Sequence, residues 1–275
     1  MDSKGKWKDG LPNELEHWRH WLASGRDGAF AGGRFDDYEW RTNPNTVLQA
    51  HIARHLEPFA PPGTTISILD VGAGPLTCVG KKWPERIVHI VAVDPLAEQY
   101  NQLLKQLNIA PLVRVQFAEV ERLSEHFPLN HFDLVNCQNA LDHVYDPFVG
   151  IQQMLAVVKP QHAVVLLHRV NEGEREGYYG LHQWNFSREG DEFTIWNKDL
   201  HLSVNEALTP IADVHFHEAW ESDLLVVSLI KKEEATEAIF AHSKSSPDLW
   251  ILSASPPQRS IAWYAKRLFG LWTRR

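Results

Sequence analysis

The stretch Ile68-Leu69-Asp70-Val71-Gly72-Ala73-Gly74-Pro75-Leu76-Thr77 joins an apolar strand to a glycine-containing turn. Gly72 and Gly74 have no side chain to keep a bound ligand away from the backbone, and Asp70 adds a negative charge where the strand enters the turn. A strand followed by such a turn is typical of an α/β fold that binds a nucleotide-type cofactor at the ends of its parallel strands.

A second apolar segment, residues 88–94, supports this interpretation. Its last residue, Asp94, follows Gly74 by about 20 residues, a distance that places a carboxylate at the end of the neighbouring parallel strand. There it can accept hydrogen bonds from both ribose hydroxyls of an adenosine. Pro95 then begins a predicted helix whose apolar side chains repeat at helical spacing, namely Leu96, Tyr100, Leu103, Leu104 and Leu107.

The charge of Asp70 indicates which cofactor binds. A dinucleotide pyrophosphate is anionic and would be repelled by this carboxylate, whereas S-adenosylmethionine carries a cationic amino group and a sulfonium and no phosphate. The dinucleotide fingerprint also needs a third glycine three residues after the second, and Thr77 stands at that position. The sequence therefore favours S-adenosylmethionine.

Two further segments complete a set of four motifs. They are Val115-Gln-Phe-Ala-Glu-Val-Glu-Arg-Leu123 and residues 132–144, the second followed by Val157-Val-Lys-Pro160. Together with the glycine turn and Asp94, they resemble the class I S-adenosylmethionine-dependent methyltransferase family from about residue 65 to about residue 231. The resemblance implies a Rossmann-like fold, S-adenosylmethionine as cofactor, S-adenosylhomocysteine as product, and methyl transfer as the activity.

The resemblance also implies further cofactor contacts. Glu119 stands where an acid contacts the adenine amino group, Val120 would line the adenine ring, and Gln138 would contact the methionine end. Arg41, in Arg41-Thr-Asn-Pro44, is similar to Arg-x-Asn-Pro runs in some quinone-pathway methyltransferases; we hypothesise that it pairs with the cofactor carboxylate, a surface ion pair being the alternative. The predicted cofactor site comprises Arg41, Asp70, Gly72, Gly74, Asp94, Pro95, Glu119, Val120 and Gln138.

Apolar runs predict seven strands. Helical patterns separate the first five, which favours parallel order, and the last two are close enough to pair antiparallel. The predicted strands are residues 65–70, 88–93, 112–117, 132–137, 162–168, 211–217 and 222–230. We expect a seven-stranded, mostly parallel Rossmann-like sheet with helices on both faces and an antiparallel last strand.

Three zones are expected. Residues 1–62 form a helical N-terminal cover, with one helix from Leu11 to Leu22 and another that begins at Asn43-Pro44. Residues 63–231 form the S-adenosylmethionine-binding domain, and residues 232–275 form a C-terminal helical tail. The tail ends in the basic, amphipathic segment 259–275, which we expect either to dock on this domain or a second subunit, or to lie on an anionic membrane surface.

Three histidines lie at or after the ends of the fourth and fifth predicted strands, where open parallel sheets bind their ligands. They are His143, His168 and His182. Methyl transfer to a hydroxyl needs a base, and a neutral imidazole near pH 7 suits that role. We hypothesise that one of the three is the general base of an oxygen methylation; for each, a capping or packing role is the alternative.

A metal site is the competing interpretation of these segments. Asp142, Glu172 and Glu174 lie near the histidines in sequence and offer mixed oxygen and nitrogen ligation to a divalent ion. No predicted helix carries a tight ligand pair such as His-x-x-x-His, so the sequence predicts no metal.

Composition limits the acceptor. A formal net charge of −8 is a poor match for nucleic acid, and Asn136-Cys-Gln-Asn139 stands where base amino-methyltransferases carry Asn/Asp-Pro-Pro-Tyr. We expect a small-molecule or saccharide acceptor, such as a sugar of a surface polysaccharide or a specialised metabolite. Aromatic side chains would build the acceptor pocket, namely Trp18, Trp21, Phe35, Tyr38, Trp40, Tyr178, Tyr179 and Trp184. The alternative is that these residues pack a helical cover.

The remaining expectations concern location and alternatives. Two cysteines cannot form a disulfide framework, and neither a signal peptide nor a spanning segment is visible, so the sequence predicts a cytoplasmic protein, with peripheral membrane contact through 259–275 as a hypothesis. A homo-oligomer is left open. The alternatives to a methyltransferase are a non-catalytic, cofactor-binding scaffold of the same fold, a nucleotide-dependent oxidoreductase, and an enzyme that uses the same cofactor for chemistry other than methyl transfer.

Overall fold

The computed structural model describes residues 3–28, 33–233 and 251–252, with the backbone only for residues 33–36 and 251–252. Seven strands form the main sheet, in the order β3-β2-β1-β4-β5-β10-β9. The strands are β1 (Thr65–Val71), β2 (Ile87–Asp94), β3 (Gln116–Phe117), β4 (Phe132–Gln138), β5 (Val158–Arg169), β9 (Ala212–His217) and β10 (Leu224–Lys231). β10 is antiparallel to β5 and β9, and the other neighbouring pairs are parallel. The expected sheet with an antiparallel last strand is confirmed.

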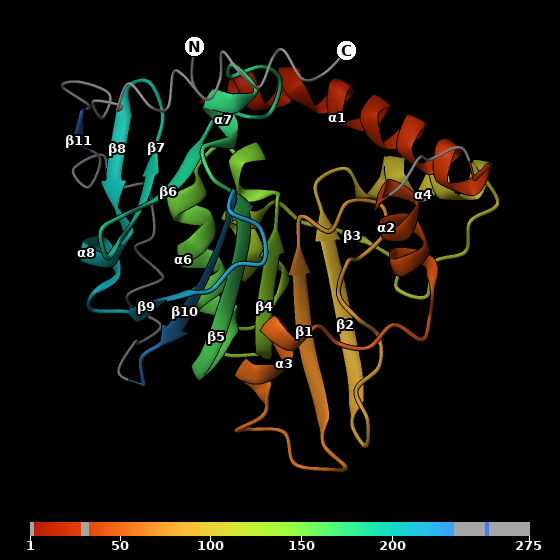
Figure 1. Cartoon of the computed structure of the whole chain (residues 1–275), viewed down its shortest axis with the longest axis horizontal. Coiled ribbons are helices and arrows are strands. Elements are labelled where there is room, and N and C mark those ends of the chain that lie inside the picture. The colour runs from red at the N-terminus through yellow and green to blue at the C-terminus, as the bar shows by residue number, and fades with distance from the viewer. Residues whose placement is uncertain (1–2, 29–32, 234–250, 253–275) are drawn as a thin grey trace.

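Helices cover both faces of the sheet because alternate strand residues are apolar on each face (Figure 1). On one face Leu69 and Leu166 pack with α6 (Pro147–Val157), which begins where the Asp146 carboxylate accepts a 3.1 Å hydrogen bond from the Val149 amide. On the other face lie α3 (Ala50–Leu56) and α4 (Ala97–Gln106). The expected arrangement of helices is therefore confirmed.

The N-terminal helix α1 (Ser3–Arg26) lies across the carboxyl ends of the parallel strands (Figure 1). Its apolar residues Trp21 and Leu22 pack with Tyr100 of α4, and the Lys4 ammonium lies 3.0 Å from a Glu119 carboxylate oxygen. The helix is longer at both ends than the predicted segment. A second helix that the sequence analysis did not predict, α2 (Gly33–Thr42), follows it.

The predicted helix start at Pro44 is wrong. Residues 43–49 form a turn and an extended segment, and the helix begins at Ala50. Two local bonds explain this, since the Asn43 side chain accepts a hydrogen bond from the Asn45 amide, and the Leu48 amide donates to the Lys82 carbonyl. Pro95 also lies in a turn, two residues before α4 begins at Ala97.

A second, four-stranded sheet, absent from the sequence prediction, lies beside the main one in the order β11-β8-β7-β6 (Figure 1). Its strands are antiparallel: β6 (Asn185–Glu189), β7 (Glu192–Trp196), β8 (Leu200–Ser203) and β11 (Ile251–Leu252). Phe186, Phe193 and Ile195 of this sheet join the core on the α6 side. The short helices α7 (Glu172–Arg175) and α8 (Val204–Leu208) flank it.

Short elements connect β3 to β4 and β4 to α6. They are η1 (Val120–Arg122), α5 (Leu123–His126) and η2 (Leu141–His143). β3 has only two of the six predicted residues, and Leu112, which was expected in this strand, is largely exposed. β3 is an edge strand, so this segment has a single neighbour with which to pair.

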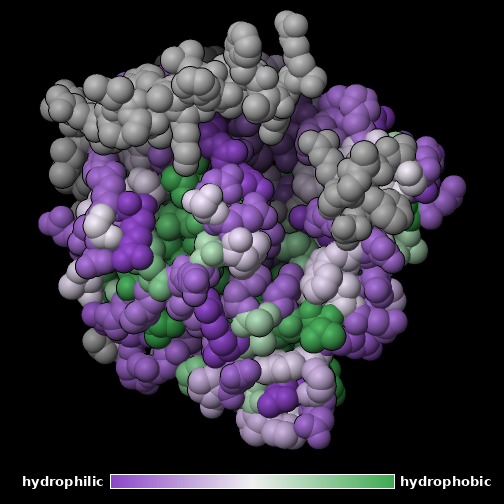
Figure 2. Space-filling view, in the orientation of Figure 1, coloured by the Kyte–Doolittle hydropathy of each residue, from purple (hydrophilic) through white to green (hydrophobic). Residues whose placement is uncertain are grey.

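Within the described residues, no helix is both long enough and apolar enough to cross a bilayer. The face seen in Figure 2 is mainly hydrophilic, and its hydrophobic areas are small and separate. The predicted amphipathic segment 259–275 lies outside the described residues.

Candidate active site

One cavity lies at the carboxyl ends of β1, β2 and β4, and α1 contributes to its wall. All nine residues predicted to bind the cofactor line this cavity: Arg41, Asp70, Gly72, Gly74, Asp94, Pro95, Glu119, Val120 and Gln138. Of the three candidate histidines, His143 is in the wall, whereas His168 and His182 are not.

Most of the contribution of α1 was not predicted from the sequence. This helix lines the cavity with Trp7, Leu11, Glu14 and Trp18, of which only Trp18 was predicted to lie near a ligand. The spacing of four, three and four residues places these side chains on one helical face. That spacing was a usable signal, but only with the knowledge that the helix crosses the strand ends.

Gly72 and Gly74 are required by the shape of the turn. Both have positive φ angles, of 66° and 63°. A Cβ atom on Gly72 would lie 2.3 Å from Cβ of Ala140, and one on Gly74 would lie 2.8 Å from Cζ2 of Trp18. Any side chain at either position would therefore strain the backbone and displace a neighbour.

Asp70 stabilises this turn through hydrogen bonds. Its two carboxylate oxygens accept hydrogen bonds from the Thr77 hydroxyl at 2.6 Å and the Asn136 amide nitrogen at 2.8 Å. Burial raises the pKa of Asp70, although these two hydrogen bonds favour the charged form. Thr77, which replaces the third glycine of a dinucleotide fingerprint, thus holds the turn closed, and Asn136 has a structural role that the sequence analysis did not identify.

Asp94 accepts hydrogen bonds from two backbone amides, Gly74 N at 3.1 Å and Leu96 N at 2.9 Å, one to each carboxylate oxygen. It is buried in the cavity wall, and burial raises its pKa to about 7. Each carboxylate oxygen retains a second lone pair. The group is therefore fixed in position and can still accept two hydroxyl donors, as a ribose would provide.

Two other predicted cofactor residues have partners in the cavity wall. One carboxylate oxygen of Glu119 accepts hydrogen bonds from the Tyr145 hydroxyl and the Lys4 ammonium, both at 3.0 Å. The Gln138 side-chain oxygen accepts from the Cys78 thiol at 3.3 Å. These bonds fix the orientation of both side chains toward the cavity.

The Arg41 side chain is largely buried, and it forms an ion pair with Asp37, whose side chain is 44% exposed. Its Nε lies 3.0 Å from both carboxylate oxygens of Asp37, and its Nη1 donates to the Leu76 carbonyl at 2.8 Å. The guanidinium carbon lies 5.6 Å from the ring centroid of Trp18. This positive charge is therefore held at the cavity wall beside the glycine turn.

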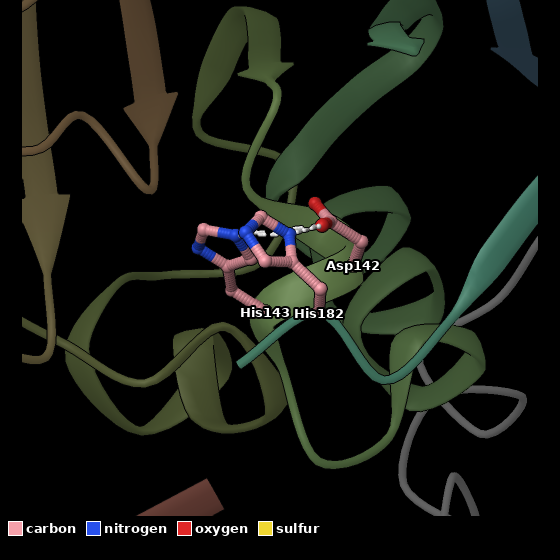
Figure 3. Close-up of side chains that lie close together, drawn as sticks. All are labelled: Asp142, His143 and His182. Carbon is pink, nitrogen blue, oxygen red and sulfur yellow. Dashed lines mark hydrogen bonds and ion pairs between the residues drawn. The ribbon is translucent and has the colours of Figure 1, made fainter. Parts of the chain in front are cut away.

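Asp142, His143 and His182 form a compact cluster (Figure 3). Nδ1 of His182 lies 2.8 Å from Oδ2 of Asp142 and 3.0 Å from Nε2 of His143. Nε2 of His143 also lies 3.4 Å from the same Asp142 oxygen. Asp142 and His143 come from η2, directly after β4, and His182 comes from the loop between α7 and β6.

The charges in this cluster affect one another. Burial opposes ionisation of His182, but the hydrogen bond and charge of Asp142 prevail and raise its pKa. Burial likewise opposes ionisation of Asp142, but the two histidines lower its pKa.

His168 differs from the other two histidines. It is buried, and its ring stacks on that of Phe186 with the two ring centroids 4.8 Å apart. Neither ring nitrogen has a hydrogen-bond partner among the described residues. Burial lowers its pKa to about 4. His168 is therefore buried outside the wall of the cavity.

The predicted acceptor aromatics do not form one surface. Trp18 lines the cofactor cavity, whereas Tyr178 and Tyr179 line a separate polar groove between α1 and the loop that carries His182. Trp184 is buried, and its indole nitrogen donates to the Val144 carbonyl. Trp21 and Tyr38 pack in the apolar cluster between α1, α2 and α4, and the Trp40 indole nitrogen donates to the Cys78 carbonyl. The Phe35 side chain lies outside the described residues.

The strand order, the glycine turn and Asp94 at the end of β2 define an α/β domain that binds a nucleoside-type cofactor at its strand ends. Residues 69–166 match the model of the methyltransferase domain family, and this part of the chain is similar to the class I S-adenosylmethionine-dependent methyltransferases. The cofactor of this family is S-adenosylmethionine, so the oxidoreductase alternative is not supported. No curated protein matches the chain in sequence.

Solved structures with a similar fold act on different acceptors. The CurJ carbon methyltransferase is 13% identical, with a TM-score of 0.44 over 64% of this chain and 51% of its own, so the match spans about half of that protein. A 16S rRNA N2 G1207 methyltransferase from T. Thermophilus is 12% identical, with a TM-score of 0.38 over 67% of this chain and 40% of its own. A TehB-like methyltransferase from Corynebacterium glutamicum is 15% identical, with a TM-score of 0.40 over 66% and 88%. These likenesses do not identify an acceptor.

Proposed function

We propose that the protein transfers the methyl group of S-adenosylmethionine to a small-molecule or saccharide acceptor, with oxygen as the target atom. The observation that carries this proposal is the single cavity that holds all nine predicted cofactor residues and His143 in its wall. Four separate motifs converge on this cavity, as a bound cofactor requires.

The wall suggests the orientation of the cofactor. The ribose hydroxyls would bond to Asp94, and the adenine would lie toward Glu119 and Val120. The methionine end would lie toward Gln138, with its carboxylate near the Arg41 guanidinium. Glu14 and His143, whose nearest charged atoms lie 3.8 Å apart, occupy the same wall.

Two observations support an oxygen acceptor of the saccharide or small-molecule class. A hydroxyl must lose its proton as it is methylated, and the Asp142, His143 and His182 cluster supplies polar groups at the edge of the cavity for that purpose. The neighbouring groove combines the rings of Tyr178 and Tyr179 with polar side chains of Asn13 and Gln183, a mixture that suits a sugar. The net charge of −8 disfavours nucleic acid.

Calorimetric titration of S-adenosylmethionine and S-adenosylhomocysteine tests the cofactor site. We expect micromolar binding to the wild type and about 100-fold weaker binding to Asp94→Ala, because charged hydrogen bonds to the ribose are lost. Arg41→Gln should also weaken binding if the guanidinium pairs with the cofactor carboxylate. The exposed Asp191→Asn is the matched control and should bind like the wild type.

A second measurement separates an enzyme from a binding protein. Production of S-adenosylhomocysteine is followed with a panel of sugars and phenolic and aliphatic alcohols, and the methylated atom is assigned by nuclear magnetic resonance. Folded wild type that fails to bind the cofactor would contradict the whole proposal. Tight binding without turnover on the panel would favour the scaffold alternative, and methylation on nitrogen or carbon would contradict the oxygen assignment.

A further inference from the structure

We propose that Asp142, His143 and His182 bind a divalent first-row transition-metal ion. Their three nearest ligand atoms, Asp142 Oδ2, His143 Nε2 and His182 Nδ1, form a triangle with sides of 2.8, 3.0 and 3.4 Å. The sequence analysis predicted no metal because these residues show no tight spacing in sequence. The fold brings the ligands together from two segments.

Hydrogen bonds alone cannot satisfy all three of these atoms. If His182 Nδ1 carries a proton, it can direct that proton at Asp142 or at His143, but not fully at both. If both facing nitrogens carry protons, two donors lie 3.0 Å apart. If neither does, unshared electron pairs face each other on all three sides. Each of these arrangements leaves at least one unfavourable contact, whereas a cation beside the plane of the triangle attracts all three atoms.

The dimensions also agree with metal coordination. Ligands at about 2.1 Å from an ion are separated by about 3.0 Å at octahedral angles and about 3.4 Å at tetrahedral angles. The three observed separations lie close to this range. Two imidazoles and one carboxylate on one face of an ion are a donor set that suits zinc, iron, manganese or cobalt, and is poorly suited to magnesium or calcium.

Backbone bonds hold the two segments in place. The Gln183 amide donates to the Asp142 carbonyl at 3.1 Å, and the Trp184 indole donates to the Val144 carbonyl at 2.9 Å. These bonds join the residues directly after His182 to η2 and the residue that follows it. The three ligand side chains are therefore positioned by the scaffold before any ion binds.

The surroundings provide a second, independent observation. His168 is 2% exposed, and both of its ring nitrogens lack hydrogen-bond partners within the described part of the chain. The same is true of the buried Oε2 atom of Glu172. Both side chains are close enough to interact electrostatically with Asp142. Buried polar atoms without partners are rare, so their presence near Asp142 indicates that this part of the fold is completed by a group other than the protein.

The site stands apart from the proposed function, but its use in catalysis rests on that function. His143 belongs both to the cluster and to the wall of the cofactor cavity. An ion held there would supply a Lewis acid for an acceptor hydroxyl at the edge of the cavity.

Metal titration of the full chain, without cofactor, tests the proposal. The protein is freed of metal by chelation and dialysis and then titrated with Zn²⁺ and Mg²⁺ by calorimetry and with Co²⁺ by visible absorbance. We expect one Zn²⁺ or Co²⁺ per chain with micromolar or tighter affinity, a Co²⁺ spectrum with imidazole ligation, and no comparable binding of Mg²⁺.

Variants identify the ligands. His182→Ala and Asp142→Asn should weaken Zn²⁺ binding by at least about 100-fold, since even changes next to metal ligands weaken binding 10- to 100-fold. His89→Ala removes an exposed histidine and should bind like the wild type. Thermal melting and S-adenosylmethionine binding establish that each variant is folded, and the conservative His182→Gln replaces His182→Ala if the latter does not fold.

Two results would overturn the proposal. One is a folded wild type that binds neither Zn²⁺ nor Co²⁺ stoichiometrically; the other is binding that His182→Ala and Asp142→Asn leave unchanged, which would assign the ion to surface histidines. Because S-adenosylmethionine binding is measured separately, either result leaves the proposed function intact, with His143 as the candidate base. If the wild type binds the metal but not S-adenosylmethionine, the metal site is supported and the proposed function is contradicted.

Discussion

The two halves of the active site differ in how their polar groups are satisfied. In the cofactor half, formed by the turn 70–77 and Asp94, both acidic side chains accept well-formed hydrogen bonds from the protein. In the histidine half, formed by Asp142, His143, His168 and His182, three ligand atoms crowd together and His168 has no partner among the described residues. The protein itself satisfies the polar groups of the first half, so that half can position a ligand. In the second half, crowded polar atoms lack sufficient partners, so a bound cation would stabilise it.

A substitution that distorts the glycine turn of the cofactor half should have the largest effect on cofactor affinity. In Gly72→Ala the new Cβ meets Cβ of Ala140 at 2.3 Å in a residue with φ of 66°, so the turn must move. We expect S-adenosylmethionine binding to fall by at least about 100-fold, equivalent to about 3 kcal/mol, by calorimetry.

Gly190→Ala is the matched control for this variant. Gly190 has the same φ of 66°, but a Cβ there would have no atom within 4 Å. Both variants introduce about 1 kcal/mol of left-handed backbone strain, which thermal melting will detect. Only Gly72→Ala adds the collision. Equal cofactor affinity in the two variants would show that the turn is not part of the binding site.

The charge of Asp94 provides a smaller, pH-dependent effect. Burial raises its pKa to about 7, with the charge of Glu14 adding to the shift and that of His143 opposing it; the buried Tyr100 hydroxyl is also nearby. Ribose hydroxyls donate to the ionised carboxylate, so protonation of Asp94 disfavours binding. Affinity for S-adenosylmethionine should be constant above about pH 8 and fall by up to tenfold for each unit below about pH 7.

Calorimetry between pH 5.5 and 8.5 in buffers of matched ionic strength would check this dependence. Asn at position 94 cannot titrate, so Asp94→Asn should bind weakly and lose most of this dependence; what remains would come from other groups of the cavity wall, such as Glu121, whose pKa burial raises to about 7. A wild-type profile as flat as that of the variant would mean that Asp94 stays ionised throughout or does not contact the cofactor.

The same contrast explains what the sequence predicted. The cofactor half depends on short motifs, in which each residue and its partners are close in the chain or at the ends of neighbouring strands. Asp70 and Thr77, for example, lie in one turn and bond directly. Such local chemistry can be predicted from spacing, as can those strands of the main sheet whose apolar runs are long and regular. The edge strand β3, which has only two residues, is the exception.

The histidine half and the second sheet depend on contacts that spacing does not show. His182 meets Asp142 only because the loop after α7 folds back onto η2, and no local pattern specifies that return. The strands β6 and β7 are short, and polar residues such as Ser187 and Thr194 are buried where they bond to each other, which hides the apolar alternation. Tertiary packing therefore decided both features.

The smallest expected effect is a change in the stability of the metal-free protein, and it tests whether the histidine half leaves a buried side chain without a partner. In His168→Leu, two buried nitrogens without partners are removed, a gain of about 1–3 kcal/mol, while the stacking on Phe186 is lost, at about 0.5–1.5 kcal/mol. The net gain of about 1 kcal/mol should raise the melting temperature by about 2 to 4 °C. His217→Leu is the matched control with the opposite sign, because the His217 ring shares a 2.8 Å hydrogen bond with the buried Ser228 hydroxyl, which would lose its partner. If both variants melt below the wild type, His168 has a partner in solution, and the contrast between the two halves of the site would have to be abandoned.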